Sequence, residues 1–156
     1  MELKVGQLAP SFELTDQNGK THNLSDIGGR WVLIYFYPKD DTPGCIKEAC
    51  LIRGNFPKFG KLNIQVFGIS ADSVKSHKKF AQKYELPFTL LADEKKEVIK
   101  KYGVWAKKKF MGKEYMGILR TSFLINPEGR ITRIYRDVKP DVHANEVLAD
   151  MVGLTG

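Results

Sequence analysis

The sequence predicts one α/β domain over residues 1–156, with a central mixed sheet flanked by helices and an N-terminal β-hairpin extension. Strand-like and helix-like segments alternate along most of the chain, which is the pattern of a sheet covered by helices. Two apolar runs, Trp31–Tyr37 and Ile64–Ser70, have the composition of strands buried in such a sheet. A length of 156 residues with 42% apolar residues is enough for one domain with its own core.

The N-terminal part of the chain leads from a hairpin to the first buried strand and then to a helix. Residues 11–24 alternate around Asn18-Gly19, a turn signal typical of a hairpin, and a loop at 25–30 precedes the strand Trp31–Tyr37. Thr42 is suited to cap a helix that has Pro43 at its first position and runs to about Phe59.

The remaining segments complete a thioredoxin-like topology with an N-terminal extension and one inserted helix. The loop Pro38–Cys45 follows the end of the first buried strand, which is where sheets of this kind hold ligands. The expected elements, in order, are a strand at Ile64–Ser70, a helix capped by Ser73 and ending near Tyr84, a strand at Phe88–Leu91, a helix from Asp93 to Tyr102, an irregular segment Val104–Leu119, a hairpin of Thr121–Ile125 with Arg130–Arg136, and a helix Asp141–Met151.

The N-terminal segment and the cysteine content favour a cytoplasmic protein. The first ten residues lack the basic and apolar regions of a signal peptide, and the longest apolar run, Trp31–Tyr37, is too short to cross a bilayer. Two closely spaced cysteines are the only ones in the chain, and they do not form the framework of a secreted protein. We therefore expect no membrane association.

Positive charge is concentrated in one part of the chain. The net charge is +7, and the segment Lys75–Lys113 alone holds twelve lysines against four acidic residues. A binding surface for nucleic acid or an acidic partner is one interpretation, but charge runs are usually solvated helix faces and loops. The segment contains no arginine, so we do not expect a nucleic-acid partner.

The spacing of Cys45 and Cys50 is the most informative feature of the sequence. Cys45 lies where the helix should begin, and the N-terminus of a helix favours the thiolate form of a cysteine. On an ideal helix, residues five apart have Cα atoms roughly 8–9 Å apart, whereas bridged cysteines need about 7 Å or less. The pair therefore predicts a reactive thiol with a partner that reaches it only after local unwinding.

Several motifs resemble those of the peroxiredoxins. The pattern Pro38-x-x-x-Thr42-x-x-Cys45 with Cys50 behind it is similar to the active-site signature of the atypical two-cysteine type, the bacterioferritin-comigratory-protein or Q group. The resemblance covers nearly the whole chain and includes the stretches at 35–45, 86–93, 102–105 and 120–126. The group often has threonine directly after the first cysteine, where this chain has Ile46, and we expect that side chain at the surface of the first turn, where it would stiffen the segment that must unwind.

The resemblance implies a thiol peroxidase and assigns roles to individual residues. By this resemblance Cys45 would be the peroxidatic nucleophile, which attacks hydrogen peroxide or an alkyl hydroperoxide, and Cys50 would resolve the resulting sulfenic acid as an intramolecular disulfide. A thioredoxin-type dithiol would then reduce the disulfide. Thr42 would donate a hydrogen bond to the thiolate and accept one from the peroxide, and Arg120 would stabilise the thiolate and hold the peroxide oxygens.

Pro38, Gly44 and Glu48 complete the set of candidate residues. Pro38 would shield the sulfur from water, while Gly44 would let the backbone approach a small substrate and offer its N–H to a developing oxyanion. Glu48 lies one turn after Cys45 and either forms a hydrogen bond within the site or is a carboxylate on the helix surface, which we slightly favour. For Arg120, a solvated position at the end of a strand is an equally valid interpretation of the sequence alone.

Two other functions compete with the peroxidase. A disulfide exchanger on the same fold should have Cys-x-x-Cys, which this chain lacks, and a basic binding module would use the lysine-rich segment. We expect no cofactor and no metal, because the sulfur carries the redox change and the three histidines show no ligand spacing. A monomer is expected, because an internal resolving cysteine needs no second subunit.

Overall fold

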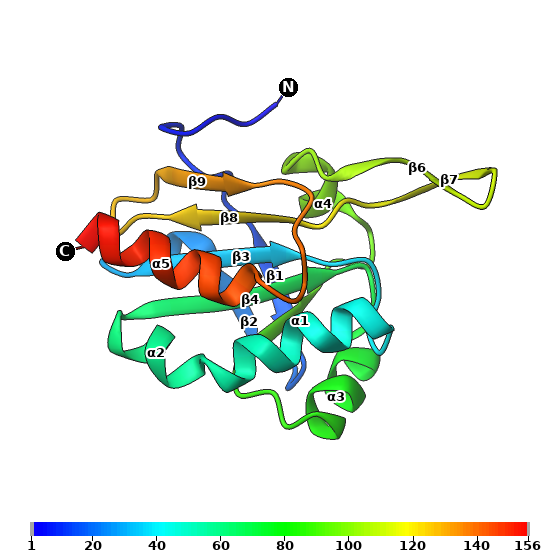
Figure 1. The fold of residues 1–156 in the computed structure, drawn as a ribbon, viewed down its shortest axis with the longest axis horizontal. Helices are drawn as coiled ribbons and strands as arrows, with labels where there is room; N and C mark the ends of the chain where they lie inside the picture. Colours follow the sequence, from blue (N-terminus) through cyan, green and yellow to red (C-terminus); the bar gives the residue numbers. More distant parts are fainter. Residues whose placement is uncertain (1, 156) are drawn as a thin grey trace.

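A seven-stranded mixed sheet forms the centre of the computed structural model, which describes residues 2–155 (Figure 1). The strand order is β2-β1-β5-β4-β3-β8-β9, in which β3, β4 and β5 are parallel and the other neighbours are antiparallel. The strands are β1 (Glu13–Asp16), β2 (Thr21–Asn23), β3 (Trp31–Phe36), β4 (Ile64–Ser70), β5 (Thr89–Ala92), β8 (Thr121–Ile125) and β9 (Ile131–Tyr135). The predicted α/β fold class with its N-terminal hairpin is confirmed.

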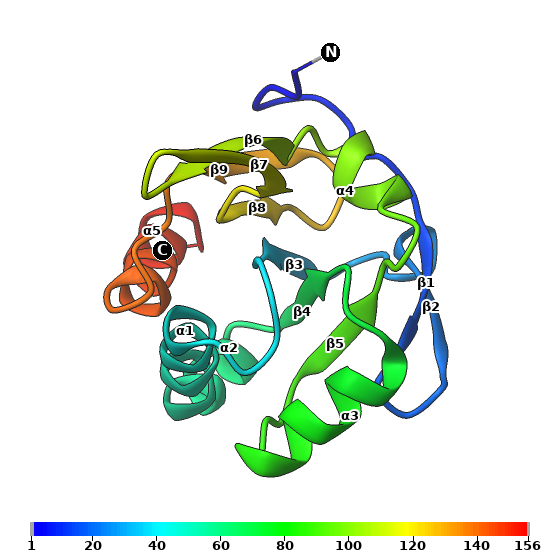
Figure 2. The ribbon, with the colours of Figure 1, turned by 90° about the vertical axis from the view of Figure 1, so that its right-hand side faces the viewer.

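Both faces of the sheet are covered, as the apolar run of β3 predicts. Leu33 and Tyr35 pack with residues of four helices on one face, whereas Ile34 and Phe36 belong to a second cluster on the other face. The first face is covered by α1 (Pro43–Gly54), α2 (Phe56–Lys61), α3 (Val74–Lys83) and α5 (His143–Thr155), and the second by α4 (Glu97–Lys101) and the N-terminal segment (Figure 2). A short 3₁₀ helix, Leu24–Asp26, follows β2.

Some helix boundaries differ from the predicted ones. The helix expected to reach Phe59 is interrupted at Asn55, and Pro57 lies in the first turn of a separate helix, α2, where its missing N–H costs nothing. The helix expected from Asp93 begins only at Glu97, and the Asp93 carboxylate instead accepts a hydrogen bond from the backbone N–H of Ile99. Ser73 caps α3 as predicted, by accepting a hydrogen bond from the N–H of Ser76.

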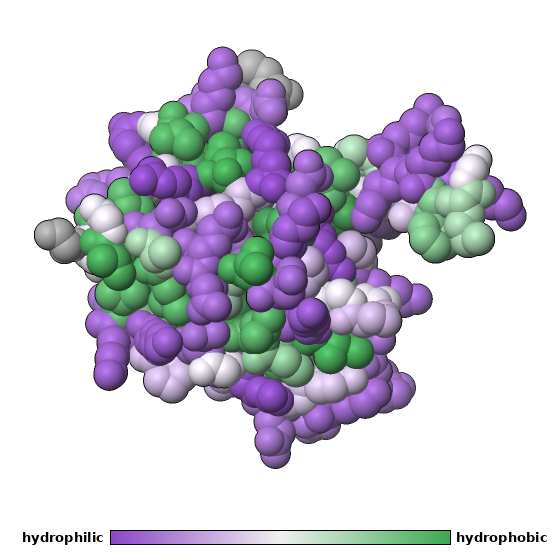
Figure 3. Space-filling view, in the orientation of Figure 1, coloured by the Kyte–Doolittle hydropathy of each residue, from purple (hydrophilic) through white to green (hydrophobic). Residues whose placement is uncertain are grey.

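The expectation of an irregular segment at Val104–Leu119 is wrong. These residues form an antiparallel hairpin, β6 (Trp105–Phe110) and β7 (Lys113–Ile118), which projects from the body of the protein (Figure 1). The turn residues Met111 and Gly112 both have positive φ, as a two-residue hairpin turn of type I′ requires. Apolar side chains gather at the far end of the hairpin, beyond a polar stretch (Figure 3).

Candidate active site

Cys45 lies at the N-terminal end of α1, as the sequence predicts. Pro43 is the first residue of the helix, Thr42 occupies the capping position with extended backbone angles, and the N–H of Ile46 closes the first turn on the Thr42 carbonyl at 2.8 Å. The Cys45 side chain is buried, with 2% exposure. A thiolate here faces the positive end of the helix dipole in a site that largely excludes water.

Thr42 does not make the capping bond that its position suggests. Its hydroxyl donates instead to the carbonyl of Lys39 at 2.8 Å, so the expected donation to the Cys45 thiolate is not what this conformation shows. A hydroxyl whose hydrogen is committed in this way still has oxygen lone pairs that accept. The Thr42 oxygen is therefore able to accept a hydrogen bond.

Arg120 contacts Cys45 directly. Its Nη2 donates to Cys45 Sγ at 3.2 Å, and its Nη1 donates to Glu48 Oε1 at 3.1 Å. The sheet explains how these distant residues meet, because β3 and β8 are antiparallel with Phe36 opposite Thr121. The residue before β8 therefore lies beside the loop that leaves β3, and the interpretation of Arg120 as a solvated strand end is wrong.

Glu48 is buried within the site, and the surface position that we slightly favoured for it is wrong. Its exposure is 1%, and burial raises its pKa to about 7, although the nearby Arg120 guanidinium acts in the opposite direction. Within residues 2–155, its second carboxylate oxygen has no hydrogen-bond partner. The sequence signal for Glu48 was its spacing of three residues from Cys45, which places both side chains on the same side of the helix. Its partner Arg120 is 72 residues away in the chain, so this local spacing could not indicate the ion pair.

Gly44 provides room for Arg120. A Cβ atom at this position would lie 2.6 Å from Arg120 Nη2 and 3.3 Å from its Cζ. The sequence suggested that this glycine admits a small substrate, and the structure adds a second requirement. Any side chain at position 44 pushes the guanidinium away from the sulfur.

Pro38 lies at the end of β3, half-buried, and lines a cavity of about 330 Å³ between the loop and the hairpin β6–β7. Trp105, Tyr115 and Met116 line the same cavity. The aromatic and methionine-rich segment therefore forms one wall beside the active-site loop. A second cavity, of about 210 Å³, lies next to Arg120 and is lined also by Leu119 and Val138.

Cys50 lies further along α1, half-buried, and both cysteines are free. Because the helix is continuous from Pro43 to Gly54, the pair has helical spacing and Cα atoms roughly 8–9 Å apart, too far for a disulfide. Ile46 is half-buried and packs against the core cluster that includes Cys45, rather than lying at the surface of the first turn as we expected. Unwinding of this turn therefore exposes apolar surface.

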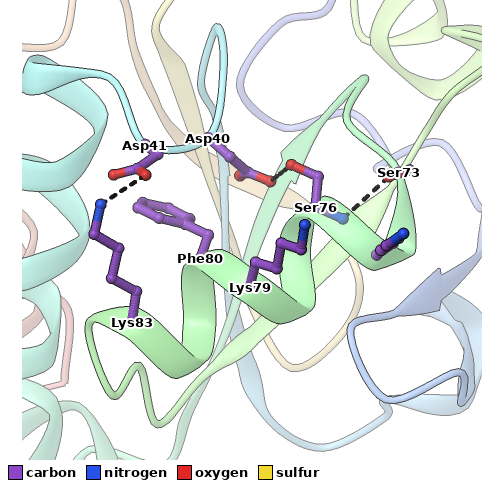
Figure 4. Close-up of a pocket in the computed structure, with 8 residues that line it drawn as sticks. Asp40, Asp41, Ser73, Ser76, Lys79, Phe80 and Lys83 are labelled. Carbon is purple, nitrogen blue, oxygen red and sulfur yellow. Dashed lines mark hydrogen bonds and ion pairs between the residues drawn. The ribbon is translucent and has the colours of Figure 1, made fainter.

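The loop between β3 and α1, which leads to Cys45, contacts α3 through two aspartates (Figure 4). The buried Asp40 carboxylate accepts hydrogen bonds from Tyr37 and Ser76 and contacts His77 Nδ1 at 2.7 Å, while Asp41 pairs with Lys83 at 2.9 Å. A cavity of about 540 Å³ lies between this loop and α3, and neither cysteine lines it. These contacts hold Asp40 and Asp41, the two residues directly before the helix cap Thr42, against α3.

His77 is part of a grouping that the sequence did not indicate. Ligand atoms of Asp40, Asp72 and His77 lie within 4.8 Å of one another. Each of the three is already engaged: Asp72 accepts from the Asp40 backbone N–H and from Ser70, and His77 Nε2 lies 3.0 Å from the Leu91 carbonyl. These hydrogen bonds explain why the three side chains lie close together: they form a structural network.

The lysine-rich segment is divided among separate elements. Four of its lysines lie on or next to α3, others lie around α4, and Lys107, Lys108, Lys109 and Lys113 lie on the hairpin β6–β7. Charge is thus distributed over several surfaces of the fold. Among residues 2–155, no helix combines the length and the apolar character needed to cross a membrane.

Comparisons with known proteins agree with the geometry. Residues 5–134 match the model of the AhpC/TSA family. The chain is 47% identical over 146 residues to peroxiredoxin Bcp of Escherichia coli (strain K12), covering 94% of each protein, and 45% identical over 148 residues to peroxiredoxin Bcp of Bacillus subtilis (strain 168), covering 95% of this chain and 94% of that protein.

Solved structures extend the similarity to the fold. A cysteine-to-serine mutant of PrxQ from Xylella fastidiosa superposes with a TM-score of 0.94 at 33% identity, covering 100% of this chain and 99% of that chain. A structure of the bacterioferritin comigratory protein of Xanthomonas campestris, studied for its alkyl peroxide reduction activity, gives a TM-score of 0.88 at 36% identity, covering 93% of this chain and 92% of that chain.

Proposed function

The chain belongs to the AhpC/TSA family and is a peroxiredoxin of the Bcp type, a thiol peroxidase, and from this we propose that it uses Cys45 and Cys50 in a two-cysteine cycle. The observation that carries the proposal is the 3.2 Å contact from Arg120 Nη2 to Cys45 Sγ at the start of α1. A guanidinium and a helix N-terminus that both face one sulfur stabilise the thiolate, the form that attacks a peroxide.

The first step is oxidation of Cys45. The thiolate attacks one oxygen of the hydroperoxide, a sulfur–oxygen bond forms, and the O–O bond breaks to release an alkoxide or hydroxide, which takes a proton and leaves as alcohol or water. Sulfur is oxidised to sulfenic acid. Arg120 balances the charge that moves from sulfur to oxygen, and the Thr42 oxygen orients the substrate by accepting its hydrogen bond.

The second step is resolution by Cys50. Its thiol displaces water from the Cys45 sulfenic acid and forms an intramolecular disulfide. Because both residues belong to one continuous helix, the first turns of α1 must unwind for the sulfurs to meet. The Asp40 contacts to α3 hold the residues just before α1 while this happens.

A thioredoxin-type dithiol is the proposed reductant, and hydrogen peroxide and alkyl hydroperoxides are the proposed substrates. The disulfide lies in an unwound and accessible segment, where an external thiolate can attack it. We further propose a monomer, because the resolving thiol belongs to the same chain, and a cytoplasmic location, because two closely spaced cysteines do not form the framework of a secreted protein.

A coupled assay tests this function. Peroxide consumption is measured with thioredoxin, thioredoxin reductase and NADPH, and with glutathione alone as the comparison. We expect turnover with thioredoxin, complete loss of turnover in Cys45→Ser, and loss of thioredoxin-dependent turnover in Cys50→Ser with one equivalent of peroxide still consumed. Equal turnover of Cys50→Ser and the natural sequence with thioredoxin would contradict the two-cysteine cycle.

A further inference from the structure

Arg120 is one cation shared by two acidic groups, Cys45 and Glu48. When Cys45 and Glu48 are both ionised, one guanidinium faces two negative groups, and it donates to each. A second cation near the sulfur would restore the balance. The hairpin β6–β7, which the sequence did not predict, brings one to this place.

Lys108 on β6 lies beside Arg120 and also beside the loop that contains Pro38. It lines the 210 Å³ cavity together with Arg120 and the 330 Å³ cavity together with Pro38, and no other residue among 2–155 lines both. Its neighbours on the strand, Lys107 and Lys109, are exposed, whereas Lys108 is half-buried. The alternation of a strand therefore turns one lysine of three toward the active site.

The side chain of Lys108 runs back along the hairpin toward its base. Lys108 is paired with Tyr115 in the strand register, yet its Nζ donates to the carbonyl of Ile118, three residues further along β7, at 3.1 Å. To reach that point it passes over Gly117, where a Cβ atom would lie 2.9 Å from Lys108 Cδ. The glycine thus leaves a channel for the lysine stem, and the ammonium lies near Arg120.

The electrostatics of Lys108 agree with this position. Burial lowers its pKa, the Arg120 guanidinium lowers it further, and the charge of Cys45 raises it. Within residues 2–155, Lys108 forms no ion pair with a carboxylate, whereas Lys107 pairs with Glu114. Among these residues, no carboxylate neutralises the Lys108 ammonium, which lies on the cavity beside Arg120.

We propose that Lys108 is a positioning residue of the peroxidase: its ammonium, held over Gly117, stabilises the Cys45 thiolate from the hairpin side of the site. The inference rests on the proposed function and adds a second cation to it. The other titratable or charged groups around the two cavities and the sulfur are Tyr35, Lys39, Glu48, Lys96, Tyr115, Arg120, Asp137 and Lys139.

The test measures thiolate formation rather than peroxidase activity. In a Cys50→Ser background, the rate of alkylation of Cys45 by iodoacetamide is followed from pH 4 to pH 10. We expect Lys108→Met to move the half-maximal pH upward by about half a unit to one unit, Lys108→Arg to keep it near the natural value, and the matched control Lys109→Met to leave it unchanged.

Gly117→Ala provides an independent variant that keeps the lysine. Its Cβ displaces the flexible Lys108 stem, so we expect an upward shift in the same direction, and no further shift when it is combined with Lys108→Met. An unchanged profile in Lys108→Met, or an equal shift in Lys109→Met, would overturn the proposal. Failure of the natural protein to consume peroxide would instead overturn the proposed function, whatever the alkylation profile shows.

Discussion

Arg120 Nη2 donates to Cys45 Sγ across 3.2 Å, although the two residues are 75 positions apart in the chain. The antiparallel register of β3 and β8 creates this contact, because it places the start of β8 beside the end of β3. The same guanidinium donates to Glu48, which is buried one turn along α1. The reactivity of the site thus depends on a strand pair as much as on the cysteine motif.

Arg120→Met should slow the oxidation of Cys45 by about 100-fold, because the thiolate and the departing oxygen both lose a charged donor. Arg120→Lys should recover only part of the loss, since an ammonium cannot serve Cys45 and Glu48 in a fork. The measurement is the second-order rate with hydrogen peroxide by stopped flow. Arg133→Met is the control, because this exposed arginine lies on β9 and donates a hydrogen bond to the backbone carbonyl of Thr132. A rate within twofold of the natural value in Arg120→Met would contradict the assigned role.

Gly44→Ala should resemble loss of the arginine. The new Cβ would lie 2.6 Å from Arg120 Nη2, so the guanidinium must leave the sulfur. We expect the second-order rate with hydrogen peroxide to fall by about 10-fold or more. Combining Gly44→Ala with Arg120→Met should cause no further fall. Independent, multiplying effects in the double variant would show that Gly44 acts on something other than Arg120.

Glu48 should make the stability of the protein depend on pH. Its pKa in the folded protein, about 7, lies above the ordinary value of 4.5, so its contribution to stability is fully present below pH 4.5 and is lost as the pH rises through 7. Glu48→Gln removes this dependence. Urea unfolding at pH 5 and pH 8 should show the natural protein losing up to about 3 kcal/mol relative to the variant. If the unfolding free energies of the natural protein and Glu48→Gln change in parallel with pH, Glu48 has the same proton affinity in the folded and unfolded states, which would contradict this prediction.

Much of the site follows from the sequence because it depends on local rules. The run Trp31–Tyr37 places a strand, Thr42 and Pro43 start a helix, and Cys45 then lies at its N-terminal end. The burial of Glu48 and the need for Gly44 could not be derived in this way, because both depend on where Arg120 arrives from β8.

The hairpin β6–β7 was missed for a different reason. Its strands contain consecutive lysines without clear alternation, and its turn is Met111-Gly112 rather than the usual Asn-Gly or Asp-Gly. The half-buried position of Lys108 beside Arg120 depends on how the two strands pair and where the hairpin lies, neither of which is a local property of the sequence.

Ile46→Thr should speed resolution by Cys50. Ile46 packs against the core, so unwinding the first turn of α1 costs its burial; threonine lowers that cost by about 1 kcal/mol. We expect disulfide formation about fivefold faster, and less conversion of sulfenic to sulfinic acid at high peroxide. The control is Lys47→Thr, which puts the same residue at an exposed neighbouring position. Equal rates of disulfide formation in Ile46→Thr and Lys47→Thr would show that helix propensity, and not the packing of Ile46, limits the unwinding of α1.

The most direct measurement of the cycle is the intact mass of the reduced protein after one equivalent of hydrogen peroxide, with Cys50→Ser alongside. A loss of about two mass units in the natural sequence, with a gain of about 16 or 32 in the variant, is the predicted result for a Cys45 sulfenic acid that Cys50 resolves. An unchanged mass of the natural protein would contradict the account, because Cys45 would then be inert despite its contact with Arg120.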